Sequence, residues 1–245
     1  MTYVSPSGPS ILVIAHRGAS ASRPENTVEA FRHAAALGAD WVELDARRTA
    51  DDRLAVHHDA VLPDGRAIVE LAAADLPASL PSLADALAAC AGMGVNIEIK
   101  NDRHDPDFDP DDRVAVAVAD LLSGPAAVLP VGRVLVTSFN PATIAVVRDR
   151  APHVPTGRLT MNGHDLAGRI ERAAAAGHVA INPWDLLVDE PMMAVARDAG
   201  LQVYVWTVDD PERMRALVDL GVDGIITNVP DVARTVVDGR PDRSA

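Results

Sequence analysis

The sequence is poor in cysteine and in basic residues, and both shortages limit what the protein can do. Cys90 is the single cysteine of the 245 residues, so no internal disulfide can form. Its place in the apolar helical run 83–91 predicts a buried small hydrophobe and not a catalytic nucleophile.

The sequence has 22 Lys and Arg residues against 35 Asp and Glu residues, which gives a net charge of −13. This balance argues against nucleic acid or an anionic membrane as a partner, because binding to either depends on a cationic field. An anionic ligand must therefore meet local positive charge or a metal.

Long apolar runs are also missing. No stretch approaches the roughly 18 residues of a membrane span, and residues 1–10 lack the basic and apolar regions of a signal peptide. We therefore expect a cytoplasmic protein without stable membrane association.

With 48% hydrophobic residues, the chain can form a large core in one domain, 1–245. We expect the ordered part to cover about 11–237 and the polar tail 238–245 to fray. Nothing in the sequence indicates an oligomeric state.

Short β-type runs alternate with amphipathic helical runs along the whole chain, which is typical of a parallel sheet wrapped by helices. The expected strands are 12–15, 41–45, 95–99, 134–137, 156–159, 179–182, 202–207 and 224–227. The expected helices are 27–37, 82–91, 112–122, 141–150, 165–176, 190–199, 211–220 and 231–237. This pattern predicts an α/β fold, a TIM (β/α)8 barrel. A doubly wound sheet is the alternative, but it usually has fewer strands, and no G-x-G-x-x-G turn follows the first strand.

One segment interrupts the alternation. Residues 53–66 contain a short extra strand, 54–56, followed by His57, His58 and a Pro-Asp-Gly turn at 63–65. We interpret this segment as a small insertion in the second βα loop.

Polar residues stand at the carboxyl ends of several expected strands, where TIM barrels carry their active sites. They are His16, Arg17, Glu43, Asp45, Glu98, Lys100, Ser138 and Trp206. Glu43 and Asp45 are two positions apart on a strand, so both side chains point to the same face. Three converging carboxylates repel one another unless a cation compensates them. Such oxygen ligands suit Mg²⁺ or Ca²⁺, and Mn²⁺ also fits, whereas the absence of paired His or Cys spacing disfavours zinc.

A plainer interpretation treats these charges as ion pairs on a barrel rim, with Glu43 bound to Arg47 or Arg48 and Glu98 bound to Lys100. For one pair alone that interpretation would be preferred. Two carboxylate-bearing strands beside a His-Arg-Gly strand end favour the metal site, because charged groups are rarely buried without a function.

Two histidines are candidates for proton transfer, which suits an imidazole because its pKa lies near working pH. They are His16 and His58. His57 competes for the second position, but it points opposite to His58 and Val56 if the strand alternation continues. Arg17 and Lys100 can neutralise a phosphate-like anion.

Two other features have modest interpretations. The acidic stretch 102–112 lacks the central Gly and terminal Glu of an EF-hand, so we expect a solvated loop that ends in a helix cap. Trp206, at a strand end, is a better candidate for contact with a ligand than Trp184, although an indole in a barrel more often serves packing.

Taken in order, these motifs resemble the glycerophosphodiester phosphodiesterases, in a form similar to the compact bacterial cytoplasmic members. The resemblance runs from Ile11 to about Val232. Its motifs are His16-Arg17-Gly18, Pro24-Glu25-Asn26-Thr27, Glu43-Leu44-Asp45, His58-Asp59, Glu98-Ile99-Lys100, Thr137-Ser138-Phe139, Trp206-Thr207-Val208 and the run from Gly221 to Pro230 that contains Thr227-Asn228. The family commonly continues from His-Asp through Leu into Arg-Thr, whereas here Leu62 is followed by Pro63. Substrate preference therefore stays open.

The resemblance implies a role for each matching residue. Glu43, Asp45 and Glu98 would bind one divalent metal, and His16 and His58 would act as the acid/base pair. Arg17 and Lys100 would hold the phosphate, and Trp206 would contact the substrate. Glu25 and Asn26 would support or join the metal site. Ser138, in the Thr137-Ser138-Phe139 motif, is a further candidate site residue without an assigned role.

The implied reaction is hydrolysis of a small glycerophosphodiester to an alcohol and sn-glycerol 3-phosphate. One alternative is a phospholipase D-like barrel that acts on lysophospholipids or sphingolipids, which would need an apolar surface at the mouth; the polar loop 102–112 argues mildly against it. Another is a barrel that binds a phosphate ester without cleaving it.

Overall fold

A closed barrel of eight parallel strands forms the centre of the protein, within the residues that this computed structural model describes, 11–124 and 131–239. The barrel strands are β1 (Leu12–His16), β2 (Trp41–Arg48), β4 (Gly94–Ile99), β5 (Val134–Ser138), β6 (Thr156–Thr160), β7 (Ala180–Pro183), β8 (Gln202–Val205) and β9 (Gly224–Thr227). Each strand pairs with the next, and β1 pairs with both β2 and β9, which closes the ring. The predicted single-domain TIM barrel is confirmed.

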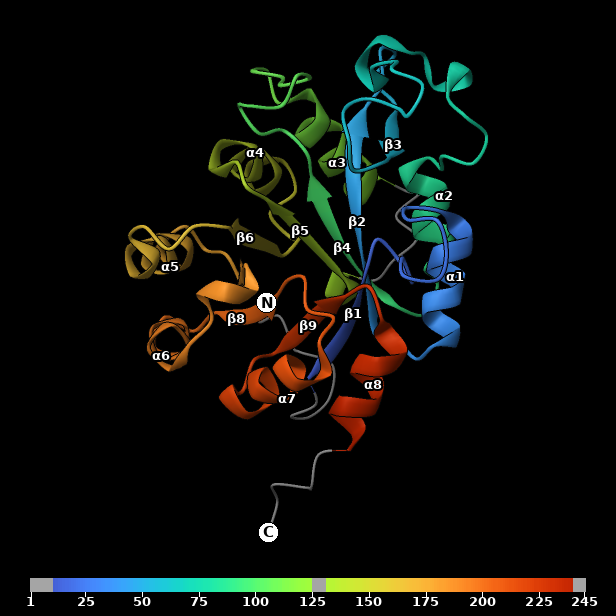
Figure 1. Cartoon of the computed structure of the whole chain (residues 1–245). Helices are drawn as coiled ribbons and strands as arrows, with labels where there is room; N and C mark the ends of the chain where they lie inside the picture. Colours follow the sequence, from blue (N-terminus) through green and yellow to red (C-terminus); the bar gives the residue numbers. More distant parts are fainter. Residues whose placement is uncertain (1–10, 125–130, 240–245) are drawn as a thin grey trace.

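Helices surround the barrel (Figure 1). They are α1 (Val28–Ala36), α2 (Leu83–Ala89), α3 (Arg113–Ser123), α4 (Pro141–Arg150), α5 (Leu166–Ala175), α6 (Glu190–Asp198), α7 (Pro211–Leu220) and α8 (Pro230–Asp238). Local capping fixes several starts: the side chains of Thr27, Asn140 and Asp189 accept backbone N–H groups of α1, α4 and α6. None of the described helices is long and apolar enough to cross a membrane.

The core has an outer layer, between strands and helices, and a smaller inner layer inside the barrel. Leu44, between the two acidic residues of β2, belongs to the outer layer. Trp41 belongs to the inner layer, together with Leu135 of β5 and Tyr204 of β8. Because strand side chains alternate, the carboxylates that flank Leu44 face the barrel interior.

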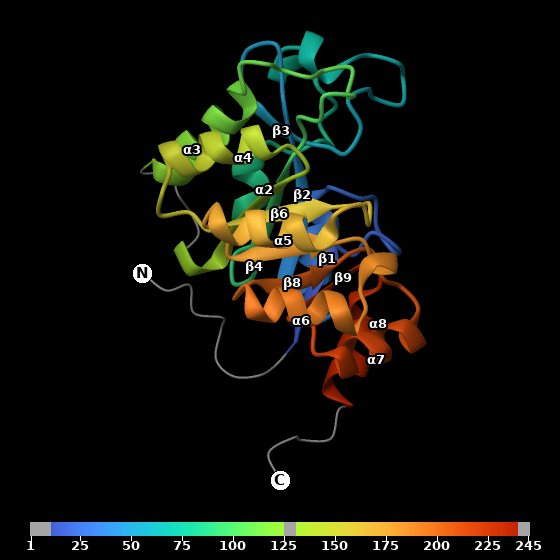
Figure 2. The ribbon, with the colours of Figure 1, turned by 90° about the vertical axis from the view of Figure 1, so that its left-hand side faces the viewer.

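The predicted insertion lies between β2 and α2. Its strand β3 (Leu54–Val56) pairs antiparallel with the end of β2, which explains why β2 continues to Arg48 instead of stopping at Asp45. Two short 3-10 helices follow, Ile68–Glu70 and Ala73–Asp75, and a small core of Ala55, Leu62 and Ile68 holds the insertion together. Figure 2 shows the insertion projecting from one end of the barrel, next to the segment that follows β4.

Three boundaries differ from the sequence prediction. β8 ends at Val205, not at Thr207, because Trp206 leaves the strand and forms a single bridge with Trp184. Asp112 does not cap α3 with its own side chain; Asp109 Oδ2 accepts the Arg113 N–H instead (3.0 Å). Asp238, expected to begin a frayed tail, is the last residue of α8. The rest of that tail from 240 onward, and the predicted absence of a signal peptide at 1–10, lie outside the described residues.

Candidate active site

Three carboxylates meet inside the barrel at the carboxyl ends of β2 and β4. Glu43 and Asp45 lie two residues apart on β2, and the register places Asp45 directly beside Glu98 of β4. One oxygen of each carboxylate lies within 4.8 Å of the others. All three residues are buried, with relative exposures of 4%, 1% and 8%. The backbone therefore brings together the acidic residues that the sequence spacing singled out.

The electrostatics of this cluster are uneven. Burial, followed by repulsion from Asp45 and Glu98, raises the pKa of Glu43 well above its ordinary value. Burial likewise raises the pKa of Glu98. Burial also acts to raise the pKa of Asp45, but Lys100 and Arg17 outweigh it, so that pKa lies below its usual range. Burial therefore disfavours the ionised forms of Glu43 and Glu98, whereas Lys100 and Arg17 keep Asp45 ionised.

Two cations border the carboxylates. Lys100 Nζ lies 2.5 Å from Glu98 Oε1 and 3.0 Å from Asp45 Oδ1. Arg17 Nε lies 3.2 Å from Asp45 Oδ2, while its Nη1 contacts Glu25 Oε1 at 3.0 Å. Both cations can approach an anion that sits over the cluster.

The turn after β1 places Arg17 by its backbone. Arg17 has a left-handed φ of 55°, and its N–H donates to the Glu43 carbonyl (2.8 Å) and lies 3.1 Å from Glu43 Oε2. Gly18 follows at φ 82°, and a Cβ there would come within 2.7 Å of the Ala30 backbone. Only glycine fits that position without strain, so the Gly of the His-Arg-Gly motif lets α1 pack close to the turn.

His16 is fixed by a chain of polar groups that the sequence analysis did not identify as site residues. Its Nδ1 lies 2.7 Å from Asn228 Oδ1, and Asn228 Nδ2 donates to Asp209 Oδ2 at 2.6 Å. Because Asp209 accepts from the amide nitrogen, the amide oxygen faces His16, which places the ring proton on Nδ1. His16 Nε2 is then free of a proton and lies 3.9 Å from Glu43 Oε2.

Asn228 had a signal in the sequence, since it belongs to one of the motifs that carry the family resemblance. Asp209 had a weaker one: it lies just beyond the carboxyl end of β8, a position that a search of every strand end would reach.

The insertion supplies His58. The His57 N–H donates to the Asp45 carbonyl (3.0 Å), so the loop that carries His58 begins beside the carboxylate cluster, and the His58 charge acts to lower the pKa of Asp45 and of Glu98. His58 Nδ1 contacts Asp59 Oδ1 at 2.7 Å. His57 instead hydrogen-bonds the Asp59 carbonyl (2.9 Å) and lines a cavity between α1 and α2 that Glu25 and Asn26 also line. β3 ends at Val56, so strand alternation does not itself determine these two orientations.

Arg47 anchors the loop that carries His58. Its Nε donates to the His58 carbonyl (2.8 Å), and its Nη1 pairs with Asp107 (2.8 Å). Asp105 adds a third contact at 3.3 Å. The acidic stretch expected to be only a solvated loop therefore supports the His58 loop.

The interpretation of Glu43 as the ion-pair partner of Arg47 or Arg48 is wrong, because Arg47 and Arg48 pair with aspartates instead.

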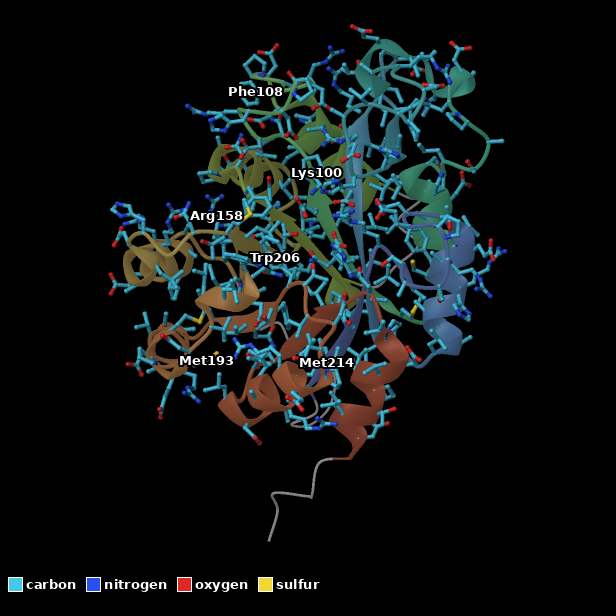
Figure 3. The ribbon with its side chains drawn as sticks, in the orientation of Figure 1. Lys100, Phe108, Arg158, Met193, Trp206 and Met214 are labelled. Atoms are coloured by element: carbon cyan, nitrogen blue, oxygen red, sulfur yellow. The ribbon has the colours of Figure 1, made fainter. Side chains whose placement is uncertain are left out.

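The remaining predicted residues lie at the edge of the site. Asn26 Nδ2 donates to Asp45 Oδ2 (2.8 Å), whereas Glu25 is half-exposed and contacts Arg17. Ser138 Oγ donates to the Ile99 carbonyl and accepts the Asn140 N–H, so it joins β5 to β4. Trp206 packs edge-on against Phe139 with ring centres 5.6 Å apart, and its indole N–H donates to the Asn182 carbonyl. Figure 3 shows Trp206 toward the middle of the ring of strands and Lys100 at the tip of β4.

The donor set fits a divalent cation. Glu43 Oε1 is buried and has no hydrogen-bond partner among the described residues, although a buried carboxylate oxygen normally has one. The three carboxylates repel one another, and their oxygens are hard ligands of the kind that Mg²⁺ and Ca²⁺ take. Glu43, Asp45 and Glu98 together can therefore hold such an ion.

The fold and the cluster of acid, base and cationic groups at the barrel mouth define an enzyme of the TIM-barrel class. The sequence profile described as "Glycerophosphoryl diester phosphodiesterase family" matches residues 16–232. The chain belongs to this family of phosphoric diester hydrolases, which confirms the resemblance inferred from its motifs.

Individual relatives align with this chain over almost its whole length. The chain is 30% identical over 247 residues to a glycerophosphodiester phosphodiesterase of Caldanaerobacter subterraneus, covering 92% of this chain and 97% of the relative. It is 31% identical to "Probable glycerophosphodiester phosphodiesterase 2" of Mycobacterium tuberculosis, covering 94% and 91%. A solved structure from Silicibacter pomeroyi, a putative glycerophosphoryl diester phosphodiesterase by its description, superposes with a TM-score of 0.83 at 28% identity, covering 95% of each chain. A phosphodiesterase of Oleispira antarctica, solved with the product sn-glycerol-3-phosphate, shares the fold with a TM-score of 0.84 at 23% identity, covering 94% of this chain and 97% of that one.

Proposed function

We propose that this enzyme hydrolyses small glycerophosphodiesters to an alcohol and sn-glycerol 3-phosphate, with a divalent cation and a two-histidine acid/base pair. One observation carries the proposal: His16, Arg17 and Lys100 lie against the buried carboxylate cluster of Glu43, Asp45 and Glu98, and the loop that carries His58 begins beside Asp45. The product bound in the Oleispira phosphodiesterase is in keeping with it.

The carboxylates would hold Mg²⁺ or Ca²⁺, with Mn²⁺ as a further candidate. When bound, such an ion supplies positive charge against the phosphoryl oxygens. Arg17 and Lys100 orient the phosphate and stabilise the negative charge that grows on it, which is usually the largest catalytic contribution.

The histidines move the protons. Burial and the Arg17 charge lower the pKa of His16, so its ring is neutral near pH 7 and Nε2 can accept a proton from the nucleophile. His58, partly exposed beside Asp59, protonates the departing alkoxide. The nucleophile is either water or a hydroxyl group of the substrate's own glycerol, which would form a cyclic phosphate.

A turnover assay with glycerophosphocholine and glycerophosphoethanolamine, in the presence of Mg²⁺, Ca²⁺ or Mn²⁺, tests the proposal. EDTA should abolish hydrolysis, and His16→Ala and His58→Ala should each lower kcat by roughly 100-fold to 10,000-fold, as expected for loss of a general acid or base. Their circular dichroism spectra should match that of the unaltered protein. His57→Ala is the matched control and should retain activity, since the His57 ring hydrogen-bonds a backbone carbonyl and has no proposed role in proton transfer. Full activity in both site variants, or activity that EDTA leaves intact, would contradict the proposal.

A second candidate substrate class has one observation in its favour. Met161, Trp184 and Leu186 are exposed by 57%, 37% and 72%, and all three follow β6 or β7 at the barrel mouth. An apolar rim of this kind suits the acyl chain of a lysophospholipid. Comparing kcat/KM for a lysophospholipid with that for its deacylated diester separates the two: preference for the deacylated diester rejects the lipid. The third possibility, binding without cleavage, does not agree with membership of an enzyme family.

A further inference from the structure

A cavity of about 560 Å³ opens from the catalytic groups toward β6 and α5. Glu98 and Lys100 line one end, and Arg158 of β6 and Arg169 of α5 line another part. Phe139 and Met161 add apolar surface between polar groups. Its volume lies in the range of pockets that hold small molecules, roughly 300–1,000 Å³. The cavity is thus continuous with the site and large enough for part of a substrate.

The charges in this cavity are not equally engaged. Its carboxylates have partners: Glu98 contacts Lys100 at 2.5 Å, Asp105 contacts Arg47 at 3.3 Å and Asp102 contacts His104 at 2.8 Å. Arg158 and Arg169, by contrast, form no ion pair with any described residue. Arg158 Nη1 reaches only the Ser138 carbonyl at 3.4 Å, and Arg169 Nε donates to the His164 carbonyl at 3.0 Å.

Arg158 is the more informative of the two, because it is partly buried. Burial, followed by the like charge of Arg169, lowers the pKa of Arg158 to about 10, and only Asp102 acts in the opposite direction. The guanidinium is still charged at neutral pH. Asp102 is engaged by His104 and forms no ion pair with Arg158, so the charge of this partly buried cation is incompletely compensated. An anion bound beside it would stabilise this arrangement.

The scissile phosphate does not account for this cation. Arg17 and Lys100 already border the carboxylate cluster where the phosphate is expected, whereas Arg158 is on β6, two strands from β4. Figure 3 shows Arg158 on the side of α5, away from Lys100. A second negative group on the substrate would reach it.

We propose that this cavity is the subsite for the alcohol portion of the substrate, and that Arg158, assisted by Arg169, selects alcohols that carry a negative group. A carboxylate or a second phosphate has the required chemistry, because both accept two parallel hydrogen bonds from a guanidinium. This inference rests on the proposed hydrolysis and names its substrate class. In an acidic protein, such a local pair of cations would offset the repulsion of an anionic substrate.

Matched diesters test the subsite. Glycerophosphoserine differs from glycerophosphoethanolamine by one carboxylate. A glycerol that carries two glycerophosphate groups differs from glycerophosphoglycerol by one further glycerophosphoryl group, which adds one negatively charged phosphodiester. Arg158→Gln should lower the ratio of kcat/KM, anionic over matched diester, by roughly 10-fold to 100-fold, as expected for loss of a hydrogen bond to a charged group. Arg158→Lys, which keeps the charge but loses the planar fork, should lower it less. If the kcat/KM ratio falls for only one of the two substrate pairs, that pair identifies the recognised anion as carboxylate or phosphate.

The control is Arg215→Gln, which removes the same charge from an exposed position on α7 and should leave both ratios unchanged. Unchanged ratios in Arg158→Gln, with melting curves that show a folded protein, would overturn the subsite while leaving the proposed hydrolysis intact. If the unaltered protein cleaves none of the diesters, the hydrolysis proposal fails. Calorimetric binding of L-serine O-phosphate against ethanolamine phosphate then tests Arg158 separately: equal loss of affinity for both in Arg158→Gln rejects the subsite, and selective loss for the serine ester supports it.

Discussion

At the scale of single residues, the site depends on groups that hold the histidines in place. Asn228 accepts from His16, while Asp209 binds both the amide nitrogen of Asn228 and its backbone N–H at 2.8 Å. Ser20 Oγ also lies 2.8 Å from Asn228 Oδ1. A neutral imidazole has one donor and one acceptor nitrogen, so whichever group takes the donor determines which nitrogen faces the substrate.

Replacing Asn228 should therefore impair turnover more than folding. We expect Asn228→Ala to lower kcat by about 10-fold to 100-fold, in the range typical of residues that orient a catalytic side chain, with a smaller change in KM. Ser20→Ala removes a hydrogen bond to Asn228 and one to the His16 carbonyl, but none to the His16 ring, and should have a weaker effect. Steady-state kinetics with melting curves measure both. If Asn228→Ala retains full kcat, the hydrogen bond to His16 is not needed for catalysis.

At the scale of elements, close strand contacts fix the geometry of the cluster. Trp41 of β2 lies opposite Gly94 of β4, and further along the same register Asp45 lies opposite Glu98. A Cβ on Gly94 would overlap the indole ring of Trp41. The glycine lets β2 and β4 pack around the Trp41 indole, which precedes Glu43 by two residues and Asp45 by four residues on the same face of β2.

Gly94→Ala should accordingly destabilise the barrel by about 2–3 kcal/mol, as overpacked core substitutions do. For a chain of this length, that corresponds to a fall in melting temperature of roughly 5–10 °C. Gly132→Ala is the control, because a Cβ there would meet no atom within 4 Å. Equal melting temperatures for the two variants would show that Trp41 shifts without cost.

The insertion shows the limit of local reasoning at this scale. Its strand and turn were predictable from residues 54–66. The contacts that support the insertion were not predictable, because Arg47 of β2 pairs with Asp105 and Asp107, which lie in a loop about 60 residues later in the chain. No local pattern records such a contact.

At the scale of the whole molecule, the net charge of −13 is combined with a buried cluster of three carboxylates. The pKa values of Glu43 and Glu98 are raised by folding, so the metal-free protein loses stability as the pH rises above the ordinary glutamate range. A divalent cation should reverse this loss by compensating the carboxylates.

Saturating Mg²⁺ or Ca²⁺ should thus raise the melting temperature. At a concentration 100 times Kd, linkage gives about 2.7 kcal/mol, or roughly 5–10 °C for a domain of this size. The shift should be smaller at pH 5 than at pH 7.5, because protons compete for Glu43 and Glu98. Glu43→Ala should remove most of it. A shift of the same size in Glu43→Ala, measured by scanning calorimetry, would place the ion elsewhere.

The sequence by itself determined the barrel, since the alternation of short apolar runs with helices is a local pattern that repeats eight times. It also determined the pairing of Glu43 with Asp45 on one face, because that follows from the two-residue period of a strand. Tertiary structure decided the rest. Arg47 holds the loop that carries His58, Asn228 and Asp209 orient His16, and Arg158 lines a cavity without an ion pair to any described residue. The physical reason is distance along the chain: these arrangements depend on contacts between segments many residues apart, which closure of the barrel brings together.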